Sequence, residues 1–162
     1  MTSLKFGHSQ LRYLFIFLLL MLGLIGCEQK PKAAGSAYAS MGGYNYTEDY
    51  IHQFYIDGAW GGNVFAYGGG GSVCCVGLPE FWRPGLTATV RWTTSSSVPG
   101  THSGETWHEH IVPIDPYGKA AGRMNVHFLP DDKIRLIVSE MGPRAIDYPG
   151  PAYPEPPADW PY

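Results

Sequence analysis

The sequence predicts an all-β fold: an antiparallel β-sandwich, immunoglobulin-like or a small barrel, with a Pro-rich C-terminal tail. Three observations support this fold class. Short apolar and β-branched runs alternate with polar residues, glycine and proline (21 and 14 residues) separate these runs, and no convincing amphipathic helix is present. Short strands punctuated by turn residues are typical of antiparallel sandwiches and barrels.

Two segments show the clearest strand pattern. LTATVRWT and RMNVHFL carry apolar residues at alternate positions, so each would turn one face toward a core. The turn residues Pro130-Asp131-Asp132-Lys133 follow the second segment and predict a β-hairpin with the next strand. The expected strands are residues 51–56, 63–67, 86–93, 107–112, 123–129 and 134–138.

The N-terminus has the layout of a bacterial lipoprotein signal. Lys5 and Arg12 precede an apolar run that is shorter than the roughly 20 residues needed to cross a bilayer. The run ends in Leu-Ile-Gly and Cys27, which resembles a lipobox, where the cysteine thiol takes a diacylglycerol and the chain is cut just before it. We therefore expect lipidation at Cys27; the alternatives are an unlipidated signal peptide and a signal anchor.

The expected location is the outer membrane, with the protein facing the periplasm. Glu28 follows Cys27 at the position where an aspartate would resemble an inner-membrane retention signal. The formal net charge of the full chain is −3, which makes nucleic acid a poor candidate partner. The expected parts are a signal peptide (1–26), a lipidated cysteine with a flexible tether (27–43), a β-sandwich domain (44–149) and a tail (150–162).

The tail is rich in proline and aromatic residues. Proline donates no backbone hydrogen bond, so this segment cannot join a central strand. We expect it to run extended over the surface, pinned by Tyr148, Tyr153 and Trp160. The alternative is a segment that binds a partner in polyproline form.

The stretch GGGGSVCCV brings a glycine run up to Cys74 and Cys75. It is not typical of a phosphate loop, because no lysine follows and no helix is expected. Thioredoxin-like redox pairs have two residues between their cysteines, and a structural zinc site usually needs four ligands, whereas the chain has three cysteines in all. Three interpretations remain open: a vicinal disulfide that shapes a loop or bulge, two free thiols, or links to other chains.

Few residues suggest chemistry. His108 and His110 would share one face of a strand and are weak candidates for metal ligands; the alternative is a polar strand face. No G-x-S-x-G nucleophile turn is present, so we expect no enzyme activity, no cofactor and no small-molecule substrate. Trp60, Trp82 and Arg83 are candidate anchors for a protein partner, because Trp and Arg dominate interface hot spots; the alternative is that the tryptophans fill the core or cap its ends.

The order of several motifs resembles a family of small proteobacterial lipoproteins associated with type VI secretion loci. These motifs are GYNYTEDYIHQFYIDGAWGGNVF, GGGGSVCCV, WRPG, TVRW and VHFLPDDKIRL. The resemblance implies an immunity protein that binds a secreted antibacterial effector, expected to be a phospholipase or lipase, and blocks it in the periplasm. The alternative is a structural or envelope-assembly lipoprotein without a toxin partner.

Overall fold

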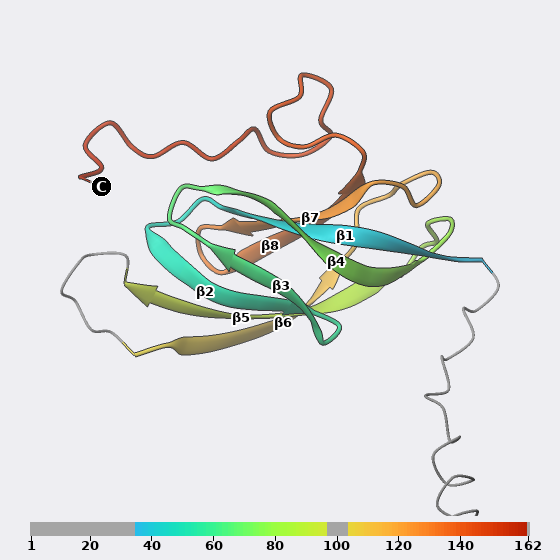
Figure 1. Ribbon diagram of the computed structural model, residues 1–162, viewed down its shortest axis with the longest axis horizontal. Helices are drawn as coiled ribbons and strands as arrows, with labels where there is room; N and C mark the ends of the chain where they lie inside the picture. Colours follow the sequence, from blue (N-terminus) through green and yellow to red (C-terminus); the bar gives the residue numbers. More distant parts are fainter. Residues whose placement is uncertain (1–34, 97–103, 162) are drawn as a thin grey trace, which may run out of the picture. The chain divides into compact units, whose positions relative to one another are not determined.

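The computed structural model describes residues 35–96 and 104–161, which contain eight β-strands and no helix (Figure 1). The expected all-β class is confirmed. The predicted signal peptide and Cys27 lie outside the described residues. In chain order the strands are β1 (Ser36–Asn45), β2 (Asp49–Ile56), β3 (Ala59–Val64), β4 (Gly69–Pro79), β5 (Thr87–Ser96), β6 (Thr106–Pro113), β7 (Arg123–Leu129) and β8 (Lys133–Ser139).

The strands form two sheets of four strands each. The first sheet has the order β4-β1-β7-β8 and the second has the order β3-β2-β5-β6. Neighbouring strands are antiparallel except β1 and β7, which run parallel, so the expectation of a purely antiparallel fold is wrong for the first sheet. A parallel pair needs a long crossover connection, and here all of the second sheet lies between β1 and β7 in the chain.

Both sheets contribute to one hydrophobic core. Phe54 of β2 and Trp92 of β5 belong to the second sheet, and Phe128 of β7 belongs to the first. The ring centroid of Phe128 lies 5.4 Å from that of Phe54 and 5.9 Å from that of Trp92. All three side chains are buried, so the alternating faces predicted for β5 and β7 do point into the core.

Strand β1 lies where part of the flexible tether was predicted. Residues 36–43 were expected to be flexible because they are small and polar, but they lie in a strand between β4 and β7. Ala39 and Met41 are buried in the core. A side chain at Gly43 would collide with Phe54 and Val64, so the small residue is required for close packing. Within the described residues the β-structure therefore begins at Ser36 and not at Tyr44.

The adjacent cysteines lie within strand β4, at a β-bulge. The register of β1 against β4 shifts between Ala39 and Met41. This shift leaves Ser40 of β1 opposite two residues of β4, Cys74 and Cys75. A bulge of this kind bends the strand and increases its twist.

The glycine run also lies in β4. A second register shift falls between Met41 and Gly43 of β1, opposite the glycines. Gly70 and Gly71 have φ angles of +119° and +67°, a region that residues with a side chain rarely adopt. The glycines therefore allow β4 to follow β1 through its second irregularity, and they do not form a separate loop tip.

The segment after β8 runs along the first sheet without forming a strand (Figure 1). The Tyr153 hydroxyl donates a hydrogen bond to the Gly69 carbonyl at 3.0 Å, and the Trp160 ring meets the Tyr67 ring edge-on at 4.9 Å. Tyr148 is 9 % exposed. These contacts attach the C-terminal segment to β4, to the loop before it and to β7. Among the described residues, no helix is long and apolar enough to span a bilayer.

Candidate functional site

The solvent side of the second sheet carries a group of aromatic residues. Strand residues alternate between faces, so those opposite the core-facing positions point outward. Tyr55 pairs with Trp60 on one side and with Arg91 on the other, and Thr93 pairs with Trp107. We call this surface the aromatic face; it comprises Tyr50, Tyr55, Trp60, Phe65, Arg91 and Trp107.

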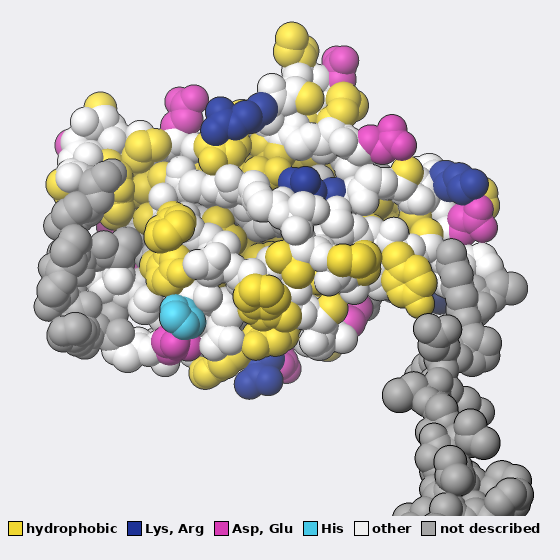
Figure 2. Space-filling view, viewed as in Figure 1, with side chains coloured by type: hydrophobic (Ala, Val, Ile, Leu, Met, Phe, Trp, Pro, Cys, Tyr) yellow, Lys and Arg dark blue, Asp and Glu magenta, His cyan; other side chains and the backbone are white. Residues whose placement is uncertain are grey.

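The aromatic face is exposed. Trp60, Phe65 and Trp107 are 54 %, 71 % and 46 % accessible to solvent. The rings of Tyr50 and Phe65 lie 5.2 Å apart, and those of Tyr55 and Trp107 lie 6.3 Å apart. Figure 2 shows patches of hydrophobic side chains on the side of the molecule that carries β3. Exposed apolar side chains gathered on one side of a sheet often mark an interaction site.

Arg91 adds a guanidinium to the aromatic face, stacked on one of its rings and paired with a carboxylate. Its guanidinium carbon lies 4.3 Å from the centroid of the Trp107 ring, and its Nε lies 3.7 Å from Oε2 of Glu109. An exposed ion pair adds little to folding stability. The stacked arginine and tryptophan instead form a pre-arranged surface whose residue types are enriched at protein interface hot spots.

A tight turn places Trp60 on this face. Asp57 and Gly58 connect β2 to β3 with φ angles of +48° and +83°, and Ile56 pairs directly with Ala59. Asp-Gly is a favoured pair for a two-residue hairpin. The sequence prediction of a strand at 63–67 was wrong, because β3 begins directly after this turn; the Asp-Gly pair was the available signal.

The structure separates the three predicted anchors. Trp60 belongs to the aromatic face, whereas Trp82 and Arg83 lie in the loop between β4 and β5. The Trp82 indole is half-buried and donates its Nε1 hydrogen to the Ile114 carbonyl at 2.9 Å, so it ties this loop to the chain after β6. Arg83 is exposed. Sequence reasoning missed Trp107 and Arg91 because their proximity depends on strand register.

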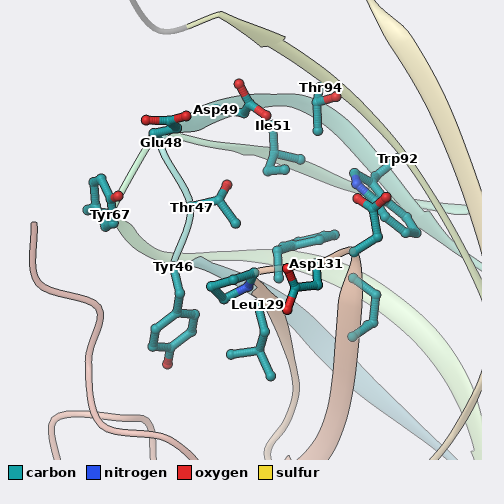
Figure 3. A pocket seen from close by; sticks show the side chains of 14 residues that line it. Tyr46, Thr47, Glu48, Asp49, Ile51, Tyr67, Trp92, Thr94, Leu129 and Asp131 are labelled. Carbon is teal, nitrogen blue, oxygen red and sulfur yellow. The ribbon is translucent and has the colours of Figure 1, made fainter.

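A pocket of about 380 Å³ lies between the sheets, beside the turn that joins β7 to β8. Figure 3 shows Glu48 and Asp49 on one side of it and Asp131 across from them, with Trp92 on a further side. Burial, together with the neighbouring Glu48 carboxylate, raises the pKa of Asp49. The pocket thus combines an acidic rim with an apolar wall.

The two candidate metal ligands, His108 and His110, both pack against Trp92. The His108 ring stacks on Trp92 at 4.9 Å, and the His110 ring meets it edge-on at 5.2 Å. His108 Nε2 lies 2.9 Å from the Thr94 hydroxyl, and its Nδ1 lies 3.5 Å from the Asp132 carboxylate. In residues 35–96 and 104–161, no group of three or more His, Cys, Asp or Glu side chains is arranged to hold a metal ion.

Comparison with family models relates the chain to other proteins. A family model described as "Protein of unknown function (DUF3304)" matches residues 44–136. The chain belongs to the DUF3304 family. The matched span contains β2 to β7, and so the whole aromatic face. Comparison with curated proteins and with solved structures finds no match.

A buried histidine connects the DUF3304 span to the C-terminal segment. The Tyr46 hydroxyl donates to the Ala152 carbonyl at 2.7 Å, so it accepts a hydrogen bond from Nδ1 of His127 at 2.9 Å. Nε2 of His127 then accepts from the Tyr148 hydroxyl at 2.5 Å. Burial, with a smaller effect of the Arg135 guanidinium, lowers the pKa of His127 to about 4. This neutral histidine holds the C-terminal segment onto the DUF3304 domain.

A disulfide joins Cys74 to Cys75. Cys74 is exposed and Cys75 is partly buried, so the bridge lies at the surface of β4. Sheet order places β4 in the first sheet and the aromatic face in the second. The bridge therefore shapes a different part of the DUF3304 domain from the aromatic face.

Proposed function

We propose that this chain is an outer-membrane lipoprotein that faces the periplasm and neutralises a type VI secretion effector by binding it, with a phospholipase or lipase as the partner. The observation that carries the binding role is the aromatic face, with exposed Trp60, Phe65 and Trp107 and with Arg91 stacked on Trp107. The identity of the effector rests on the motif resemblance. In this proposal the two sheets form a β-sandwich, and the second sheet presents the aromatic face to the partner.

The aromatic face has the size and chemistry of an interface core. An aromatic side chain buries about 150–250 Å² when it is fully covered. The five aromatic side chains are already partly covered, with Trp60, Phe65 and Trp107 46–71 % exposed, so they would supply part of the ~800 Å² that each partner buries in an interface of standard size. Tyr, Trp and Arg are the residue types that contribute most to binding energy in such contacts.

The proposed lipid anchor would place the inhibitor where it is needed. A lipase that reaches the periplasm attacks the bilayer, and lipidation at Cys27 would hold the aromatic face close to that bilayer. Inhibition by binding requires neither a catalytic group nor a cofactor, and the protein would use no small-molecule substrate.

The test is capture of partners by the full-length lipoprotein from detergent-solubilised membranes of cells that express the effector. We expect one stoichiometric lipase whose activity falls on binding, and we expect the double variant Trp60→Ala/Trp107→Ala to lose it. Phe81→Ala is the matched control, because Phe81 is also exposed, at 61 %, but lies outside the aromatic face.

Two outcomes would contradict the proposal. Recovery of envelope scaffold proteins alone would favour the structural or envelope-assembly lipoprotein. Retention of the lipase by the double variant would show that a different surface binds it.

A further inference from the structure

We propose that two copies of this chain associate through their β6 strands, so that the second sheet continues from one copy into the other across a two-fold axis. The inference goes beyond the proposed function, because it concerns pairing of the protein with itself. It rests on the position of β6 in its sheet, on the residues along it and on the charges beside it.

Strand β6 is a regular sheet edge, as is β8 in the other sheet. It lies at the margin of the second sheet and pairs with β5 without a register shift from Thr106 to Pro113 (Figure 1). Edge strand β4 has two register shifts against its neighbour, whereas β6 has none. Each of these edges packs beside an edge of the other sheet, β4 beside β3 and β6 beside β8. The bridge between the chain after β6 and β8, Ile114 to Leu136, lies just beyond the end of β6. A regular, exposed edge is a template for a further strand.

The residues of β6 are self-complementary when two β6 strands pair in the antiparallel direction. The sequence Trp107-His108-Glu109-His110-Ile111 has the same order of residue types in both directions: apolar, histidine, acid, histidine, apolar. An antiparallel pair with its two-fold axis at Glu109 therefore places Trp107 opposite the partner's Ile111. The same register places His108 opposite the partner's His110.

The apolar pair favours association. Trp107 and Ile111 are 46 % and 75 % exposed, although they lie in a regular strand. Pairs of an aromatic and a β-branched residue directly opposite each other stabilise antiparallel strands. Because of the symmetry, each dimer would contain this pair twice.

The charges beside β6 balance in this register. Two Glu109 carboxylates would meet at the axis, and like charges directly opposite each other are unfavourable. Each carboxylate, however, has Arg91 on its other side, at 3.7 Å and directly opposite in β5. The row across four strands would be Arg91, Glu109, the partner's Glu109 and the partner's Arg91, with two positive and two negative charges.

This pairing would leave most of the aromatic face open. Tyr55 and Trp60 lie on β2 and β3, on the far side of β5 from β6. A two-fold axis produces an interface in which both copies contribute the same strand. Two aromatic faces would then lie on one continuous sheet.

The first experiment measures the mass of the full-length protein in detergent by sedimentation, without any effector. We expect a dimer at micromolar concentration. Ile111→Lys should weaken the dimer by about tenfold or more, because it removes both apolar pairs. Ile146→Lys is the matched control, because Ile146 is fully exposed, at 101 %, in the segment after β8.

Two further variants test the register. Glu109→Gln removes the like charges at the axis and should tighten the dimer. Glu109→Cys should form a cross-linked dimer in the oxidising periplasm, because residues at the axis face each other at about 5 Å, whereas Thr87→Cys on β5 should not.

A folded wild-type monomer at tens of micromolar would overturn the proposal, as would a dimer that survives Ile111→Lys. If the wild-type protein forms a dimer but Glu109→Cys does not cross-link, the proposed β6 register is wrong. Circular dichroism of each variant would verify that it is folded. None of these outcomes depends on the effector, so failure here is separable from failure of the proposed function.

Discussion

The Tyr148 hydroxyl donates a hydrogen bond to Nε2 of His127 at 2.5 Å, and this contact joins the C-terminal segment to β7. His127 is completely buried and its other ring nitrogen is bonded to Tyr46. The aromatic ring of Tyr44 stacks on the same imidazole at 5.3 Å. The C-terminal segment has no regular secondary structure. It is held on the sheet by its hydrogen bond to the buried imidazole of His127.

Tyr148→Phe tests the strength of this attachment. The change removes the hydroxyl and leaves a buried ring nitrogen without a partner, which costs about 1–3 kcal/mol in the free energy of unfolding. Tyr153→Phe is the control, because it removes a more exposed hydrogen bond to Gly69 and should cost less. Urea denaturation of both variants measures the difference. Equal losses would contradict the role assigned to His127.

The His127 environment also predicts how stability depends on pH. The pKa of His127 is lowered from 6.5 to about 4 in the folded protein, so the unfolded chain binds a proton first as the pH falls. Stability is therefore complete above about pH 6.5 and falls by about 1.4 kcal/mol per pH unit between about pH 6 and pH 4.

Urea denaturation across this pH range measures the effect. In His127→Gln the slope between pH 6 and pH 4 should become much smaller. His52→Gln is the control, because His52 is exposed beside Glu105, and this variant should keep the slope. An unchanged slope in His127→Gln would assign the pH dependence to other groups.

Loss of the Cys74–Cys75 disulfide should have little effect on global stability. A disulfide stabilises mainly by restricting the unfolded chain, and this effect grows with the length of the closed loop. The sequence separation here is 1, so the loop is minimal. We expect Cys74→Ser/Cys75→Ser to shift the unfolding free energy by less than about 1 kcal/mol, as measured by thermal denaturation. A loss of several kcal/mol would show that the bridge supports more than the local bulge.

The β4 irregularity predicts a position where glycine is required. Gly71 has a φ of +67°, and a side chain there costs about 1–2 kcal/mol. Gly71→Ala should lower the midpoint of denaturation, whereas Gly104→Ala should not, because Gly104 has no positive φ and no neighbour near its side-chain position. Similar midpoints for the two variants would contradict the assignment of a bulge at Gly71.

Residue patterns within single segments were sufficient for part of the fold. Strand β7 was predicted with the bounds that the structure shows, and the hairpin to β8 was expected from Pro130-Asp131-Asp132-Lys133. Both depend on neighbours in sequence, namely the alternation that buries one face of a strand and a turn that brings two short strands together. The predicted burial of Trp92 and Phe128 followed from the same alternation.

Strand β1 and the aromatic face could not be predicted in this way. SAYASMGGYN has small residues, and it is a strand because β4 and β7 bind it on both sides and Phe54 needs the space at Gly43. Arg91 and Trp107 meet because β5 and β6 pair in one particular register.

The sequence by itself determined the all-β class, the alternation of the core strands and the expectation of a lipid anchor, because these depend on local patterns. The tertiary structure decided where β1 lies, which aromatic residues share a surface and which strands form the sheet edges. These features depend on contacts between segments that are distant in the chain, and only the folded packing of the two sheets specifies them.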